Sequence, residues 1–186
     1  MNVYSIALFL HISGALGFFV ALGLEWTGLR QICSAVNLDQ VRAWMGILKG
    51  VRKVGFASML TTVITGIYMT LTGWGGAAWI LVTLGSLVLV IALAQALTGP
   101  RMAAIGRALV TERGVFSRTY HNLANHPLLW ISIQTRAAIA LGIVFLKVFR
   151  PDLAGSLIAI GVAIVLGIAS ALPADNREQA QEGTAH

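Results

Sequence analysis

Apolar residues gather in five long runs, and the segments between them hold most of the charged side chains. The runs cover residues 3–24, 54–72, 78–98, 128–149 and 154–172. A helix needs about 20 mostly apolar residues to cross the hydrocarbon core of a bilayer. The pattern therefore predicts an all-α, polytopic membrane bundle of five transmembrane helices, a single domain over residues 1–172. The polar segment 173–186 is predicted to be a disordered tail.

Composition indicates the same class of protein. Hydrophobic residues make up 57% of the chain and charged residues only 11%, whereas a soluble domain averages about 25% charged residues. Such a thin polar shell excludes a soluble enzyme. It also changes the meaning of the net charge of +6, which we assign to basic loops facing anionic lipid and not to nucleic acid.

The basic residues indicate an orientation. They concentrate in the two long connections, which hold Arg30, Arg42, Lys49, Arg52, Lys53, Arg101, Arg107, Arg113 and Arg118. The opposite side has only Lys147 and Arg150. By the positive-inside rule the long connections are cytoplasmic. We therefore expect a multi-pass protein of a bacterial-type inner (plasma) membrane, with the N-terminus outside and the C-terminus in the cytoplasm.

The first long connection has a helical pattern of its own. Asn37 followed by Gln40 is typical of a capped helix start. One face of the predicted helix is apolar and another is basic, with Val41, Trp44, Met45, Leu48 and Val51 on the first and Arg42, Lys49 and Lys53 on the second. This pattern fits an interfacial amphipathic helix in the lipid headgroup region, and equally a helix packed under the bundle.

The second long connection also contains helix signals. Gly99 and Pro100 favour a helix start, and the pattern predicts a short helix to about Thr111, with Gly114 as its stop. The sequence Asn125-His126-Pro127 is typical of a capped start and is expected to open the fourth run.

Two ionisable side chains lie deep inside apolar runs, where such groups are functional candidates. At 1.5 Å per residue, His11 is about 12 Å into the first run and Arg136 about 13 Å into the fourth, from opposite faces. Both therefore fall near mid-depth, and we expect that they can meet. His11 is a candidate ligand for haem iron, copper or zinc, or a packing residue. Arg136 either binds an anionic group of a ligand or is tied to Glu25.

A second ligand for His11 is not evident. His121 and His126 belong to the second long connection, about 20 Å away along the helix axis. No cysteine or carboxylate completes a metal site with them. We interpret His126 as a helix cap and His121 as a surface residue. Walker, dinucleotide, His-Glu-x-x-His and serine-elbow motifs are absent from the sequence.

The opening segment Leu8-Phe9-Leu10-His11-Ile12-Ser13-Gly14-Ala15 resembles the first span of copper-resistance D-type and protoporphyrinogen oxidase membrane proteins. With Gly-Leu-Glu-Trp at 23–26 and Gly-Pro-Arg-Met at 99–102, the whole chain is most similar to small uncharacterised bacterial integral membrane proteins. In the haem-binding relatives the first-span histidine ligates haem. The resemblance implies that role for His11 alone.

Three hypotheses follow for function. The first is a membrane protein that serves as a redox or transport accessory, with haem b or a metal at His11. The second is a membrane-bound haem or quinone oxidoreductase in which Arg136 binds an acidic group, so whether the chain is an enzyme is left open. The third is a structural subunit whose small-residue face docks a membrane-protein partner or a second copy. That face comprises Ala159, Ala163 and Gly167.

Overall fold

The computed structural model describes residues 2–74, 76–111 and 118–172, and every regular element in these residues is helical. Five helical stretches are long and apolar enough to cross a membrane, which confirms the predicted five-span bundle. The predicted stop at Gly114 and the tail 173–186 lie outside the described residues. The elements are α1 (Val3–Cys33), α2 (Leu38–Met69), η1 (Thr70–Trp74), α3 (Ala78–Leu93), η2 (Ala94–Thr98), α4 (Gly99–Thr111), α5 (Arg118–Ala124), α6 (Pro127–Phe149) and α7 (Leu153–Ala171).

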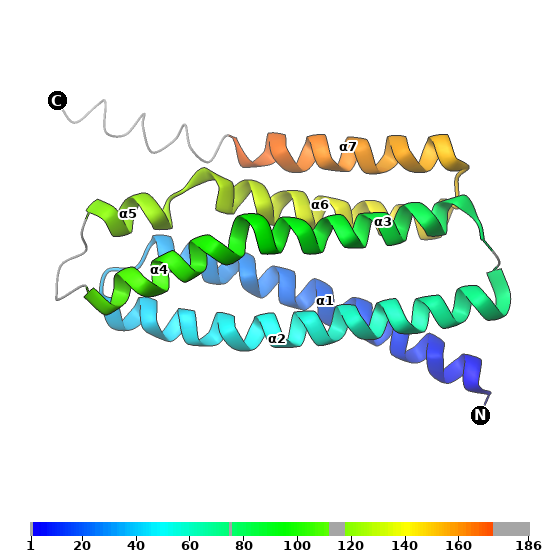
Figure 1. The fold of residues 1–186 in the computed structure, drawn as a ribbon, viewed down its shortest axis with the longest axis horizontal. Helices are drawn as coiled ribbons and strands as arrows, with labels where there is room; N and C mark the ends of the chain where they lie inside the picture. The colour runs from blue at the N-terminus through cyan, green and yellow to red at the C-terminus, as the bar shows by residue number, and fades with distance from the viewer. Residues whose placement is uncertain (1, 75, 112–117, 173–186) are drawn as a thin grey trace.

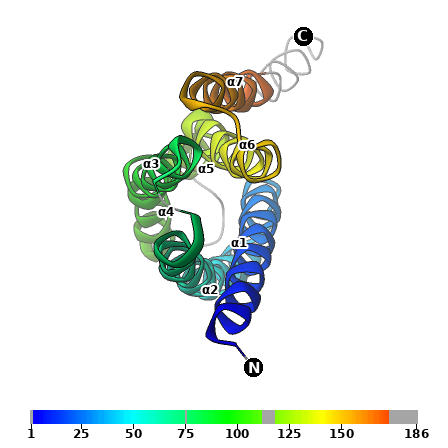
Figure 2. The ribbon, with the colours of Figure 1, turned by 90° about the vertical axis from the view of Figure 1, so that its right-hand side faces the viewer.

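The long helices run side by side along the longest axis of the molecule (Figure 1). One end carries the N-terminus and the turns before α3 and before α7, and we call it the hairpin end. The other end carries α4 and α5. Seen along the bundle, α1, α2, α3 and α6 are arranged in a ring, and α7 lies outside it against α6 (Figure 2). Helices α2 and α3 follow each other in the chain but make few direct contacts.

The interior is densely filled at the α4–α5 end. Leu29 and Ile32 of α1, Ile105 of α4 and Tyr120 of α5 are almost fully buried in one apolar cluster there. The Tyr120 hydroxyl donates to the Ile32 carbonyl at 3.0 Å, which satisfies the polar tip of the ring. A second, smaller cluster joins α3, α6 and α7. Packing thus closes one end of the ring, so any space left inside it must lie toward the hairpin end.

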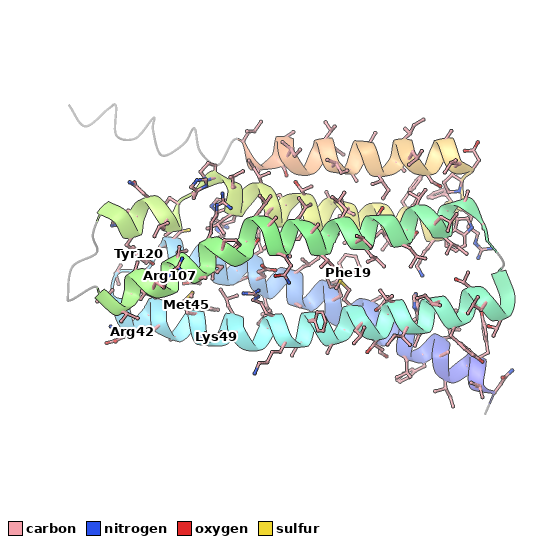
Figure 3. All side chains as sticks on the ribbon, in the orientation of Figure 1. Phe19, Arg42, Met45, Lys49, Arg107 and Tyr120 are labelled. Carbon is pink, nitrogen blue, oxygen red and sulfur yellow. The ribbon has the colours of Figure 1, made fainter. Side chains whose placement is uncertain are left out.

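The amphipathic segment after Asn37 is the first half of α2 and not a separate interfacial helix. Its start is capped as predicted, because Asn37 Oδ1 accepts from the Gln40 N–H at 2.8 Å. Its apolar residues Val41 and Leu48 are buried in the α4–α5 cluster instead of facing lipid. Lys49, on the other side of the helix, points away from the bundle (Figure 3). The partner for the apolar face is α1 and α4, which the pattern of one segment could not identify.

A π-helical turn, η2, joins the third span to α4. The sequence predicts a new helix at Gly99, but the chain stays helical through Pro100, with the Gly99 N–H donating to the Ala94 carbonyl five residues earlier. Pro100 has no backbone N–H to donate, and its ring crowds the preceding helical turn. The wider π-helical turn relieves this crowding. The Leu93 carbonyl accepts instead from the Ser132 hydroxyl at 3.3 Å. Thr98, the last residue of the turn, is buried in the bundle.

Close helix packing uses the small residues that the sequence singles out. A Cβ built on Gly167 of α7 would lie 2.5 Å from the Thr135 Cα of α6, and Ala163 packs beside Gly142 of α6. A Cβ on Gly14 of α1 would lie 2.6 Å from Thr62 Oγ1 of α2. The face expected to dock another subunit is therefore covered by α6 of the same chain.

Candidate functional site

A cavity of about 360 Å³ lies inside the ring, toward the hairpin end. Side chains of α1, α2, α3 and α6 line it, and it is partly open to the surroundings of the bundle. Its size falls within the range of about 300–1,000 Å³ that is typical of small-molecule sites. Almost all of its lining is apolar, and the exceptions include His11, Thr83 and Lys147.

His11 of α1 is buried against α2, where Gly66 leaves room for the imidazole ring. Its Nδ1 lies 2.9 Å from the Thr62 carbonyl oxygen and 3.2 Å from Thr65 Oγ1. A carbonyl only accepts hydrogen bonds, so Nδ1 carries the proton of the neutral ring. The lone pair is therefore on Nε2.

Lys147 of α6 provides the partner for that lone pair. Its Nζ lies 2.6 Å from His11 Nε2 and donates to it. The acidic residues that the structure describes are all engaged elsewhere. Glu25 binds Arg136, Asp39 binds Arg42, and Asp152 caps the start of α7. Among the described residues, Lys147 thus faces an apolar cavity with a neutral imidazole as its partner and no carboxylate.

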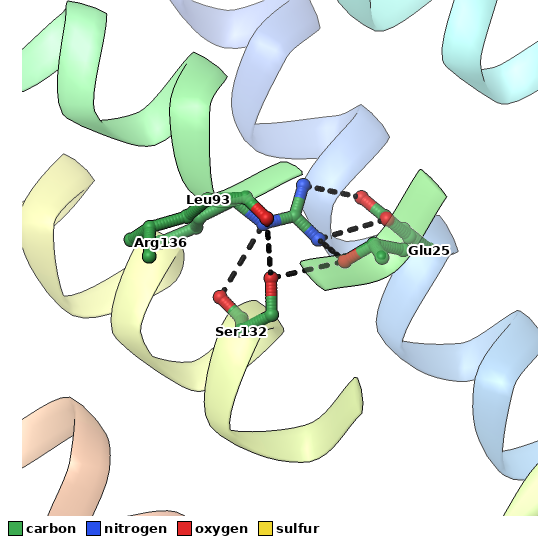
Figure 4. A network of polar contacts seen from close by, with 5 residues as sticks. Glu25, Leu93, Ser132 and Arg136 are labelled. Atoms are coloured by element: carbon green, nitrogen blue, oxygen red, sulfur yellow. Dashed lines mark hydrogen bonds and ion pairs between the residues drawn. The ribbon is translucent and has the colours of Figure 1, made fainter. Parts of the chain in front are cut away.

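Arg136 and Glu25 form a second polar centre on the α4–α5 side of the cavity (Figure 4). The guanidinium donates through Nη1 and Nη2 to the two carboxylate oxygens, at 3.0 and 2.8 Å. Nε also donates to the Ser132 carbonyl at 3.3 Å, and Nη2 to Thr98 Oγ1 at 3.4 Å. The two charged side chains are only 5% and 13% exposed. This geometry is the Arg–Glu tie that was one of the two interpretations of Arg136.

A smaller cavity, of about 110 Å³, lies beside this ion pair. Phe18 and Met59 line both cavities and stand between them. The smaller cavity is below the usual size of a ligand site. We therefore place the candidate binding site in the larger cavity.

His11 and Arg136 do not meet, contrary to expectation. His11 pairs with Lys147, eleven residues beyond Arg136 on α6, or about 16 Å along the helix. Sequence reasoning missed Lys147 because it was counted among the charges outside the membrane. A signal was present, however. His11 and Glu25 are about four turns apart on α1, and Arg136 and Lys147 about three turns apart on α6, so each pair shares one helix face.

The other histidines take the predicted structural places. The His126 ring accepts from the Leu128 N–H at 3.3 Å and caps α6. His121 is exposed, and its ring lies edge-on to Tyr120. Within residues 2–74, 76–111 and 118–172, no group of three His, Cys, Asp or Glu side chains is close enough to hold a metal ion.

The residues present do not fit haem in this arrangement. The contact from His11 Nδ1 to a backbone carbonyl is what a ligating histidine makes. Iron would need the Nε2 lone pair, however, and Lys147 Nζ occupies it. Arg136, the candidate partner for an anionic group of a ligand, is paired with Glu25.

Comparisons of the chain with protein-family models, with curated proteins and with solved structures find no match. The resemblance of the first span to haem-binding membrane families thus stays a prediction. Interpretation of function rests on the cavity and its residues.

Proposed function

We propose that this protein binds an amphipathic small molecule in the cavity, with an anionic headgroup held by Lys147. The observation that carries the proposal is the environment of this side chain. Lys147 lines an apolar cavity inside a membrane-spanning bundle, and no described acidic residue pairs with it. A cation in such surroundings is costly without a counter-charge, and a bound anion would supply one.

The shape of the site supports an amphiphile over a small hydrophilic anion. Apolar side chains such as Phe19, Leu87 and Val144 form most of the lining and suit a hydrocarbon chain. Helices α2 and α3 both line the cavity and make few contacts with each other. A molecule dissolved in the bilayer would enter between them.

Equilibrium binding of radiolabelled dodecanoate and dodecanol to the full-length protein in nanodiscs tests this function. A hydrogen bond to a charged group contributes about 1.5–3 kcal/mol. We therefore expect wild type to bind dodecanoate at least about tenfold more tightly than dodecanol, and Lys147→Met to remove most of this difference.

The matched control is Lys49→Met, which also removes one lysine charge, from the exposed side of α2. It should bind both probes as wild type does. Equal affinity of wild type for acid and alcohol, or an unchanged preference in Lys147→Met, would refute the proposal.

We also propose that the α4–α5 end faces the cytoplasm of a bacterial-type inner membrane, with the N-terminus outside. The clustering of basic side chains toward this end, among them Arg42, Lys49 and Arg107, supports the orientation. Impermeant thiol labelling tests it, with a single cysteine placed at Ser34 or at Asp152 in a Cys33→Ser background. In intact cells the second cysteine should react and the first should not. The reverse pattern would overturn the orientation.

A further inference from the structure

The hydroxyl of Thr83 is the group on the cavity wall that helix geometry does not explain. The Thr62 hydroxyl donates to the Ser58 carbonyl at 2.9 Å, and the Thr70 hydroxyl donates to the Gly66 carbonyl at 2.8 Å. Both are satisfied by their own helix, as is usual for threonine. Thr83 differs from them. The residue is only 7% exposed, yet its buried Oγ1 has no hydrogen-bond partner among the described residues.

Helix α3 does not prevent such a bond. Ser86, one turn further along the same helix, donates to the Val82 carbonyl at 2.8 Å. Buried hydroxyls in folded proteins are almost always hydrogen-bonded, and an unpaired one calls for a specific reason. Since Thr83 lines the same cavity as Lys147, a group bound in that cavity is the nearest available reason.

Building on the proposed function, we infer that Thr83 donates a second hydrogen bond to the headgroup, from α3, while Lys147 donates from α6. Two donors on different helices, one of them a cation, favour a headgroup that accepts several hydrogen bonds and carries a negative charge. The ligand is then a carboxylate or a phosphate with a hydrocarbon chain, and not an alcohol or an amine.

The test compares Thr83→Val with wild type in the nanodisc binding assay, using dodecanoate, dodecyl phosphate and dodecanol. Valine keeps the shape of threonine and removes the hydroxyl. We expect about a tenfold loss of affinity for the acid that wild type prefers, because hydrogen bonds to charged groups are the strong ones. Dodecanol binding should be unchanged. Thr83→Ser, which keeps the hydroxyl, should bind the acid as wild type does.

Thr135→Val is the matched control, because Thr135 Oγ1 is the other buried hydroxyl without a described partner. Thr135 lies against α7 at Gly167 and lines neither of the two cavities. Its variant should bind all three probes as wild type does. Whichever of dodecanoate and dodecyl phosphate binds more tightly to wild type identifies the headgroup as carboxylate or phosphate.

Two outcomes separate this inference from the proposed function. If Lys147→Met loses the preference for acids and Thr83→Val keeps full affinity, the role of Thr83 is overturned while the site stands. If neither variant changes binding, both are overturned. An equal loss in Thr135→Val would also overturn the role of Thr83, because the effect would then be general to buried hydroxyls.

Discussion

Removing the Glu25 carboxylate should destabilise the bundle strongly, because it leaves the Arg136 guanidinium buried without a counter-charge. We choose Glu25→Gln, which keeps the shape of the side chain and removes its charge. The remaining acceptors for Arg136 carry no charge and lie further away, the Ser132 carbonyl at 3.3 Å and Thr98 Oγ1 at 3.4 Å. They cannot replace two shorter bonds to a negatively charged carboxylate, at 3.0 and 2.8 Å.

Breaking one side of a buried ion pair typically costs about 3–5 kcal/mol. The guanidinium is the more deeply buried partner, 5% exposed against 13% for the carboxylate. We therefore expect Glu25→Gln to lower the free energy of unfolding by about 3 kcal/mol or more, and Arg136→Met to lower it by less. The double variant buries no charge. It should be more stable than the sum of the two single effects predicts, by about 0.5–3 kcal/mol.

The measurement is equilibrium unfolding of the full-length protein in mixed detergent and dodecyl sulfate micelles, followed by helical circular dichroism. Asp39→Asn is the control, because it breaks the Arg42–Asp39 pair, whose side chains are 53% and 92% exposed. An exposed pair contributes about 0–1 kcal/mol. If Glu25→Gln is no more destabilising than Asp39→Asn, or if the two single effects simply add, the buried tie does not stabilise this bundle.

Two further predictions test the packing and the cofactor. Gly167→Ala should lower the free energy of unfolding by about 1–3 kcal/mol, because the added methyl overpacks against the Thr135 backbone. Gly161→Ala on the same helix is the control, since no atom lies within 4 Å of its Cβ, and it should be neutral or slightly stabilising in the same unfolding assay. Equal effects of the two substitutions would contradict the α6–α7 contact. Absorption spectra of the purified protein, oxidised and dithionite-reduced, should lack a Soret band because Lys147 occupies the Nε2 lone pair of His11. A Soret band that disappears in His11→Ala would restore the haem hypothesis.

The five spans and several helix starts could be predicted from the sequence alone. A run of about 20 apolar residues must be a helix in a bilayer, because every backbone group has to be satisfied within its own segment. The caps at Asn37 and at His126-Pro127 were predictable for a similar reason, since each involves groups only a few residues apart. Counting residues along single helices did not predict how His11 and Arg136 lie relative to each other. It placed both near mid-depth, whereas His11 is level with Lys147, about 16 Å along α6 from Arg136.

Only the tertiary structure decided which polar groups meet. Helices α1 and α6 run antiparallel, and their register brings His11 to Lys147 and Glu25 to Arg136. A shift of one turn would change both pairings without altering the apolar pattern of either helix. The same holds for the cavity, which exists because the α4–α5 cluster fills one half of the ring and leaves the other half open. Apolar side chains are interchangeable toward lipid, so the pattern of one helix does not encode how closely its neighbours approach.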